Sequence, residues 1–290
     1  SAIDWCLAEM KLDGFQNVRG EEVTVPRWVR GNESAELLLP RRRVLPMLGL
    51  GGSVGTPAEG IIADVLVVTG FDDLKQRAAE AKGKIVLFNV PFTEYRETVI
   101  VRTQGAIHAA QAGAVASLIR SVGPFSMQTP HTGGMSYADG IKKIPHVALS
   151  LEDANMLSRM AIRGEPIRVR LKMEARTLVD GVSRNVIAEI PGTEKPEEIV
   201  IVSGHIDSWD VGQGAMDDGG GCLAAWEAAR LILKLGLRPR RTVRVVLWTN
   251  EENGMRGARQ YAKRHKAALA KHTLAIESDA GVFQPTGFGF

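Results

Sequence analysis

Cysteine is scarce in this sequence, with Cys6 and Cys222 the two in 290 residues. Two cysteines exclude the dense disulfide framework of a small secreted scaffold, although they neither prove nor exclude secretion. No apolar run approaches the roughly 20 residues that a membrane-spanning helix needs, so we predict no membrane span. The sequence has no initiator Met or signal-peptide pattern and stops abruptly at "PTGFGF". We therefore expect a mature or cut-down piece of a longer protein.

The sequence also lacks a strong excess of one charge. The formal net charge is +3, and Lys and Arg are scattered along the chain rather than gathered in one stripe. Nucleic acid is therefore not expected as a partner. The short basic runs at 41–43 and 238–241 are interpreted as solvated surface. The hydrophobic fraction of 44% is enough for real cores, and the length suggests one large domain or two moderate ones.

The middle of the chain has the pattern of a compact mixed α/β module. Strands bounded by glycine are predicted at 60–70 and 83–90, and a helix at 102–114 precedes a further strand at 114–120. A second helix is predicted at 149–164, with Ser150 and Asp153 at capping-box spacing and Gly164 as its stop. The alternating run at 166–173 predicts another strand. Before this module, a short helical opening precedes an alternating strand around Val23 and Val25.

From about residue 183 the pattern changes to apolar strands separated by helices. Strands are predicted at 184–192 and 197–205, a strand followed by a loop at 242–254 and again at 272–281, and an amphipathic helix at 220–236. Continuous apolar strands of this kind are typical of a buried, mostly parallel sheet. We therefore predict an α/β fold with a mostly parallel mixed sheet flanked by helices.

Acidic and imidazole side chains follow three of these strands. In open parallel α/β sheets, sites form just beyond the carboxyl ends of the strands, so we expect these side chains to meet. Converging carboxylates repel one another and need a compensating cation. The residues concerned are His205, Asp207, Asp217, Asp218, Glu251, Glu252, Glu277 and Asp279.

One histidine among several carboxylates is a ligand set suited to Zn²⁺ or another divalent metal. A surplus of carboxylate also suits two metals that share a bridging carboxylate and a hydroxide. Each acid taken alone is better explained as a loop or helix-cap residue than as a ligand, and Asp217 and Asp218 could simply cap the following helix. The other histidines lack acidic surroundings and are interpreted as structural or exposed; they are His108, His131, His146, His265 and His272.

Three segments carry a resemblance to a known family. The segments "SGHIDSWDVGQGAMDDGGG" (203–221), "LWTNEENGMRGARQY" (247–261) and "ESDAG" (277–281) resemble the aminopeptidase-type di-zinc metallopeptidases. The resemblance covers essentially the whole chain, and the middle module is similar to the protease-associated lid inserted in the catalytic domain of that group. It implies an incomplete zinc exopeptidase fold, with residues 1–38 and 179–290 in the catalytic domain and 39–178 in the lid.

The resemblance implies a metal role for four residues. His205 and Asp279 correspond to ligands of the first zinc, Asp217 to the carboxylate that bridges both zinc ions, and Glu252 to a ligand of the second. The peptide bond between Asp217 and Asp218 is expected to be cis, as is usual in the family. The family completes the second zinc site with a His far towards the C-terminus, and we expect that ligand to lie beyond Phe290.

The resemblance also implies the catalytic roles. Glu251 corresponds to the general acid/base, and Asp207 to the acid that orients His205. The implied activity is hydrolysis of small unblocked peptides, chiefly dipeptides, by a carboxypeptidase- or dipeptidase-type enzyme. The implied setting is a homodimer that is secreted or lysosomal, where the sequon at Asn32 could carry a glycan.

Three alternatives to the exopeptidase stay open. A receptor-like or binding protein on the same fold would have lost its metals, and a one-zinc acyltransferase would use a similar fold for another reaction. The chain as it stands could also be an inactive truncated form, since its second zinc site lacks a ligand.

Overall fold

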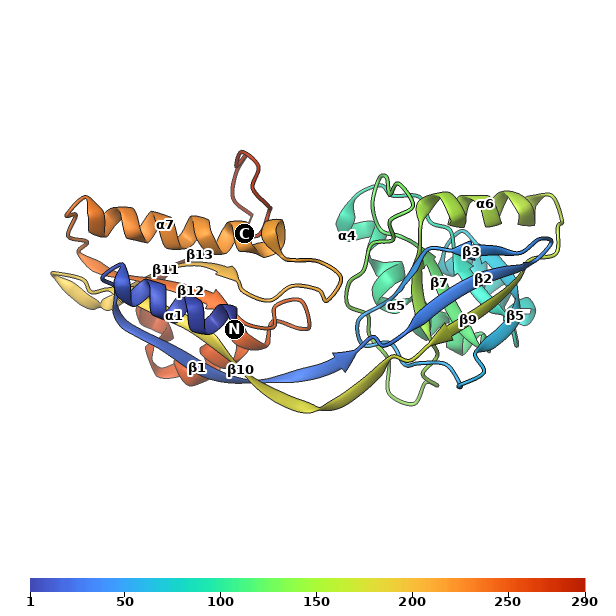
Figure 1. Ribbon diagram of the computed structural model, residues 1–290, viewed down its shortest axis with the longest axis horizontal. Coiled ribbons are helices and arrows are strands. Elements are labelled where there is room, and N and C mark those ends of the chain that lie inside the picture. Colours follow the sequence, from blue (N-terminus) through green and yellow to red (C-terminus); the bar gives the residue numbers. More distant parts are fainter. Residues whose placement is uncertain (290) are drawn as a thin grey trace. The chain divides into compact units, whose positions relative to one another are not determined.

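The computed structural model describes residues 1–289, which form two compact units (Figure 1). One unit comprises Ser1–Pro26 with Asp180–Phe290, and the other comprises Arg27–Val179. The second unit is therefore an insertion, which the chain enters through β1 (Gln16–Val29) and leaves through β10 (Arg176–Ile190). The boundaries predicted at 38/39 and 178/179 stay a prediction; the first falls within β2 (Glu33–Leu39).

The first unit is built on a five-stranded sheet in the order β1-β10-β12-β11-β13. The strands β11 (Lys195–His205) and β12 (Arg241–Trp248) are parallel, and so are β11 and β13 (His272–Glu277). The strand β10 runs antiparallel to β12. The predicted mostly parallel mixed sheet is confirmed in the part that carries the acidic strand ends.

Helices cover both faces of this sheet. Successive side chains of a strand point to opposite faces, so Val186 and Ile187 of β10 belong to different cores. One core packs against α1 (Ala2–Leu12) and α7 (Gly220–Lys234), and the other against α8 (Arg256–Arg264). Short helical segments complete the unit as η1 (Ala215–Gly219) and η2 (Lys266–Lys271).

The long helix α7 ends as its sequence predicts. Gly236 has a φ of +65°, donates its N–H to the Leu233 carbonyl, and is followed by Leu237, which bonds back to Ile232. This left-handed turn satisfies carbonyls of the last helical turn at low cost because glycine has no Cβ.

The inserted unit contains an eight-stranded sheet in the order β3-β2-β9-β5-β6-β7-β8-β4. Its centre, β5 to β8, is parallel, while β5 is antiparallel to β9 on the other side. The strands are β3 (Arg43–Leu45), β4 (Met47–Gly49), β5 (Ile61–Val68), β6 (Ile85–Phe88), β7 (Ala116–Arg120), β8 (His146–Leu149) and β9 (Arg168–Met173). The helices are α2 (Phe71–Gln76), α3 (Ala78–Ala81), α4 (Tyr95–Thr98), α5 (Ile100–Gln111) and α6 (Leu151–Ile162).

Two apolar cores lie on the two faces of this sheet. The helix α6 shows how side-chain hydrogen bonds define the start of a helix in this unit. The Ser150 hydroxyl accepts the N–H of Asp153 at 3.1 Å, as predicted for the helix start. The Asp153 carboxylate instead accepts from the Ser150 hydroxyl and from Arg43 at 2.8 Å. Gly164, with a φ of +71°, follows the helix end. The predicted α/β class with an inserted α/β module is therefore confirmed. None of the helices within residues 1–289 is long and apolar enough to cross a membrane.

Candidate metal centre

The carboxyl ends of three neighbouring strands form one edge of the five-stranded sheet. His205 is the last residue of β11 and lies opposite Trp248 of β12, while Ser203 lies opposite Glu277 of β13. The loops that leave these strands therefore start side by side. The register brings together the strand ends that the sequence pattern singles out.

Three of the predicted ligands converge at this edge. The donor atoms of His205, Asp217 and Asp279 all lie within 4.8 Å of one another. The Nε2 atom of His205 is 3.0 Å from Oδ1 of Asp217 and 3.3 Å from Oδ1 of Asp279. The imidazole is 1% exposed, whereas the side chains of Asp217 and Asp279 are 67% and 45% exposed. The imidazole of this group is therefore buried, while its two carboxylates are partly exposed to solvent.

The electrostatics of His205 fit a cation at this position. Burial by itself lowers the pKa of the imidazole, but the hydrogen bond and charge of Asp279, with the charge of Asp207, raise it to about 10. Either an imidazolium or a bound cation would offset the charge of these carboxylates. One neutral imidazole and two carboxylates would hold Zn²⁺ in the same place, so the donor set fits the predicted metal.

Glu251 and Glu252 lie in the loop after β12, close to this group. Burial, and then the charge of Asp217, raise the pKa of Glu252 to about 7. Its Oε2 accepts the indole N–H of Trp209 at 2.6 Å, so it is held by a hydrogen bond that sequence reasoning missed. Burial is also the main cause that raises the pKa of Glu251. Glu252 does not belong to the three-residue convergence described above.

Asp207 connects His205 to this glutamate pair. The Nδ1 atom of His205 lies 2.9 Å from the main-chain carbonyl of Asp207 and 3.8 Å from its carboxylate. The carboxylate instead accepts the main-chain N–H groups of Glu251, at 2.9 Å, and Glu252, at 3.3 Å. Asp207 therefore contacts the imidazole through its carbonyl and fixes the glutamate loop through its side chain.

Asp218 ties the strand end to the helix behind the metal group. It is 1% exposed, and its carboxylate accepts the main-chain N–H of His205 at 2.9 Å and of Gly221 at 3.0 Å. The bond between Asp217 and Asp218 is cis, as the resemblance implies. A Cβ on Gly221 would lie 1.8 Å from the carbonyl oxygen of Ser278, so only glycine fits at this approach.

Glu277 is part of the same acidic surroundings, although the sequence assigned it no role. Glu277 is exposed as a residue, but partial desolvation of its carboxyl group, and then the charge of Asp279, raise its pKa to about 7. The sequence pattern had already placed it among the acids at the strand ends, without a specific role. The other histidines show structural surroundings: His146 is fully buried, His108 stacks on Phe71, and His265 and His272 bond to Glu21 and Tyr261.

Comparison with known proteins defines the class of this fold and site. Residues 185–290 match peptidase family M28, and residues 57–157 match the PA domain. The M28 match lies in the unit with the five-stranded sheet, called the peptidase unit below, and the PA match lies in the inserted unit, called the PA unit below. Over 289 residues it is 55% identical to human carboxypeptidase Q and 54% identical to the mouse protein, covering 100% of this chain. The predicted resemblance is confirmed. The chain spans 61–62% of the length of these relatives.

Solved structures agree with this assignment. The peptidase M28 precursor from Shewanella amazonensis SB2B superimposes with a TM-score of 0.93 at 40% identity, over 97% of this chain and 65% of that one. A zinc aminopeptidase from Bacillus subtilis superimposes with a TM-score of 0.69 at 23% identity, over 96% of this chain and 62% of that one. The second likeness concerns the fold alone.

Proposed function

We propose that this protein is a zinc-dependent exopeptidase that hydrolyses small unblocked peptides, chiefly dipeptides. The observation that carries the proposal is the convergence of His205, Asp217 and Asp279 at the carboxyl edge of the sheet. The similarity to carboxypeptidase Q, and the match to peptidase family M28, support the reaction class.

Two zinc ions are proposed. His205, Asp217 and Asp279 would hold the first, while Asp217 would bridge to the second and Glu252 would bind it. When bound, such a pair makes hydroxide available near neutral pH and polarises the scissile carbonyl. The hydrogen bond from Trp209 to Glu252 supports a fixed orientation of that carboxylate.

Glu251 is proposed as the general base. It would take the proton of the attacking water and pass it to the leaving amine. Two features support this role: the raised pKa of its half-buried carboxyl group, and the hydrogen bond that Asp207 accepts from its main chain. The adjacent glutamates then divide the work, since Glu251 moves protons and Glu252 binds metal.

The setting of the enzyme is also a proposal. We expect a homodimer, secreted or lysosomal, in which Asn32 of the sequon Asn32–Ser34 can carry a glycan. Asn32 is exposed, which supports access by the modifying enzyme. Its side-chain amide donates to Glu174 at 3.0 Å, and this bond would be lost on modification.

The test compares the zinc-loaded full-length protein with its Glu251→Gln variant on unblocked dipeptides. We expect the wild type to cleave them and the variant to lose at least about 100-fold in kcat, because the proton acceptor is gone. Zinc content measured by atomic absorption should be unchanged. Glu197→Gln, an exposed surface variant, is the matched control. If the wild type cleaves no unblocked dipeptide, the peptidase assignment is wrong; if Glu251→Gln keeps full activity, the role of Glu251 is wrong.

A further inference from the structure

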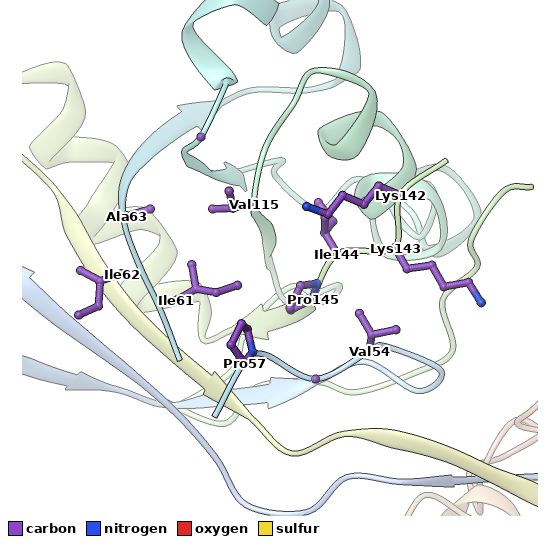
Figure 2. Close-up of a pocket in the computed structure, with 12 residues that line it drawn as sticks. Val54, Pro57, Ile61, Ile62, Ala63, Val115, Lys142, Lys143, Ile144 and Pro145 are labelled. Carbon is purple, nitrogen blue, oxygen red and sulfur yellow. The ribbon is translucent and has the colours of Figure 1, made fainter. Parts of the chain in front are cut away.

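The inserted PA unit contains a groove far along the chain from the metal ligands. It has a volume of about 450 Å³, within the range of ligand sites, and most of its lining is apolar. Figure 2 shows Ile61, Val115, Ile144 and Pro145 facing one another, while Ile62 lies on the outer side of its strand. Such a groove can take side chains of a partner.

The groove lies where the parallel part of the sheet begins. Three of its lining residues come just before three parallel strands: Gly83 before β6, Val115 before β7 and Pro145 before β8. Its other wall is the first half of β5, at Ile61–Ala63. The pairing of β5 with β6 begins only at Val65. The groove therefore runs across the amino ends of three strands, beside a part of β5 that β6 does not reach.

The first half of β5 has one open edge. Ile61–Asp64 pair with β9, and Val65 donates its N–H to the carbonyl of Ile167 just before β9. Main-chain groups of successive strand residues point to opposite edges, so the N–H and C=O of Ile62 point away from β9. In the part of the chain that the structure describes, no strand pairs with this edge at Ile61–Ala63. An open edge of this kind can accept an added strand.

The charge of the groove selects the partner. Its charged lining residues are Lys142 and Lys143, both exposed and both in the loop before β8. The Nζ atom of Lys143 lies 5.5 Å from the centre of the Tyr137 ring, which favours a defined position. The nearby carboxylate of Asp64 is already paired with Arg168 at 2.7 Å. The lysines are thus available for acidic groups of a partner.

We propose that this groove docks an extended peptide segment of a partner protein, with apolar residues followed by acidic ones. The segment adds as a strand beside Ile61–Ala63, places an apolar side chain against Val115 and Ile144, and directs its acidic end to Lys142 and Lys143. This binding is independent of hydrolysis at the metal centre.

The probe is the blocked peptide acetyl-Val-Thr-Val-Glu-Asp-amide, labelled with fluorescein and followed by fluorescence anisotropy with the full chain. An exopeptidase that needs free ends cannot bind it productively. We expect saturable binding that weakens at least about tenfold in the Lys142→Glu/Lys143→Glu variant. The matched control, Lys75→Glu/Lys266→Glu, carries the same change of charge at exposed positions elsewhere and should keep the wild-type Kd.

Two further peptides test the mode of binding. The charge-reversed peptide acetyl-Val-Thr-Val-Lys-Lys-amide should bind at least about tenfold more weakly. Two further peptides are each N-methylated on one of the two alternating sets of amides. Their Kd values should differ, because only one edge of the added strand pairs with β5. Equal binding of these two peptides would overturn strand addition. No binding of the parent peptide, or equal loss in the two double lysine variants, would overturn the docking site itself.

Discussion

The buried imidazole of His146 should make the PA unit less stable as the pH falls. Its side chain is 0% exposed, with Nε2 at 3.0 Å from the Arg102 carbonyl and Nδ1 at 3.4 Å from the Ser117 carbonyl. Burial lowers the pKa of His146 to about 4, and the carbonyls of Ser117, Arg102 and Val101 only partly oppose this effect. The folded unit therefore holds the imidazole neutral in a place that charge would make unfavourable.

The sign and size of the effect follow from linkage. The pKa of His146 is about 4 in the folded state and about 6.5 in the unfolded state, so the unfolded chain binds the proton first as the pH falls. The contribution to stability is fully present above pH ~6.5 and is lost as the pH falls towards 4. At ~1.4 kcal/mol per pKa unit, the whole loss is about 3 kcal/mol, of which roughly 1 kcal/mol is gone by pH ~5.5.

The assay compares the wild type with His146→Gln, whose amide does not titrate. Hydrogen exchange of the amides of β6, β7 and β8, corrected for the intrinsic rate at each pH, gives the free energy of opening of this unit. We expect the variant to be less stable at neutral pH by roughly 1–3 kcal/mol, because a buried ring is lost. The gap between the two proteins should shrink by about 1 kcal/mol between pH ~7.5 and ~5.5.

Other titrating groups change the stability of both proteins by the same amount as the pH falls. The difference in stability between them therefore reports on His146 alone. A gap that stays constant over this pH range would refute the reasoning. If the variant does not fold, an NMR titration of the wild-type imidazole decides the question: a pKa near the ordinary histidine value would refute it equally.

Three further predictions concern the proposed metal centre and its framework. Asp218→Asn should lower the free energy of unfolding in urea by about 2–3 kcal/mol, since one of the two main-chain N–H groups would face an amide N–H instead of an oxygen. An unchanged unfolding midpoint would contradict this. Gly221→Ala should lower the free energy of unfolding by more than about 3 kcal/mol, because its Cβ meets the Ser278 carbonyl. The control Gly236→Ala, whose Cβ meets only open space, should lower it by about 1 kcal/mol. Equal shifts of the melting temperature in the two variants would contradict the steric argument. Asp279→Asn should weaken Zn²⁺ binding at least about tenfold by calorimetry, and an unchanged Kd would remove Asp279 from the ligand set.

The features that the sequence predicted well are those with a strong local pattern. The apolar runs of β11, β12 and β13 each end in polar residues, and a parallel sheet must bring such ends to one edge. The helix α7 has both an apolar face and a glycine just past its end, so its C-terminal turn could be predicted closely.

The helix α8 shows why other elements were missed. Its sequence "RGARQYAKR" is strongly polar in composition, and Tyr261 is its one large apolar contact with the core. The first turn is held by close packing instead: a Cβ on Gly257 would lie 2.3 Å from the Asn185 amide oxygen and 2.5 Å from the Thr249 carbonyl. Gly257, Ala258, Tyr261 and Ala262 do recur at helical spacing, but the segment is short and its residues other than Tyr261 are small on that face, so the helical pattern was overlooked.

The same limit applies within the metal centre. Sequence and resemblance could predict that Asp207 lies beside His205, but the atom that contacts the imidazole depends on the path of the loop. The structure gives the carbonyl this contact and gives the carboxylate to the glutamate loop. Similarly, the resemblance gave Asp218 a role only in the cis peptide bond. In the structure its buried carboxylate also accepts two main-chain N–H groups.

Two sets of ionisable groups within residues 1–289 respond to desolvation in opposite ways. The PA unit keeps His146 neutral among carbonyls, so burial costs little at neutral pH. At the sheet edge of the peptidase unit, desolvation raises the pKa values of Asp218, Glu252 and Glu277, and the neighbouring carboxylates raise that of His205. Several carboxyl groups therefore lie around one imidazole in a place that disfavours their ionised form. Their charge lowers the stability of the fold unless a cation offsets it. That cost supports the proposed metal centre at the acidic, glycine-rich stretch after β11.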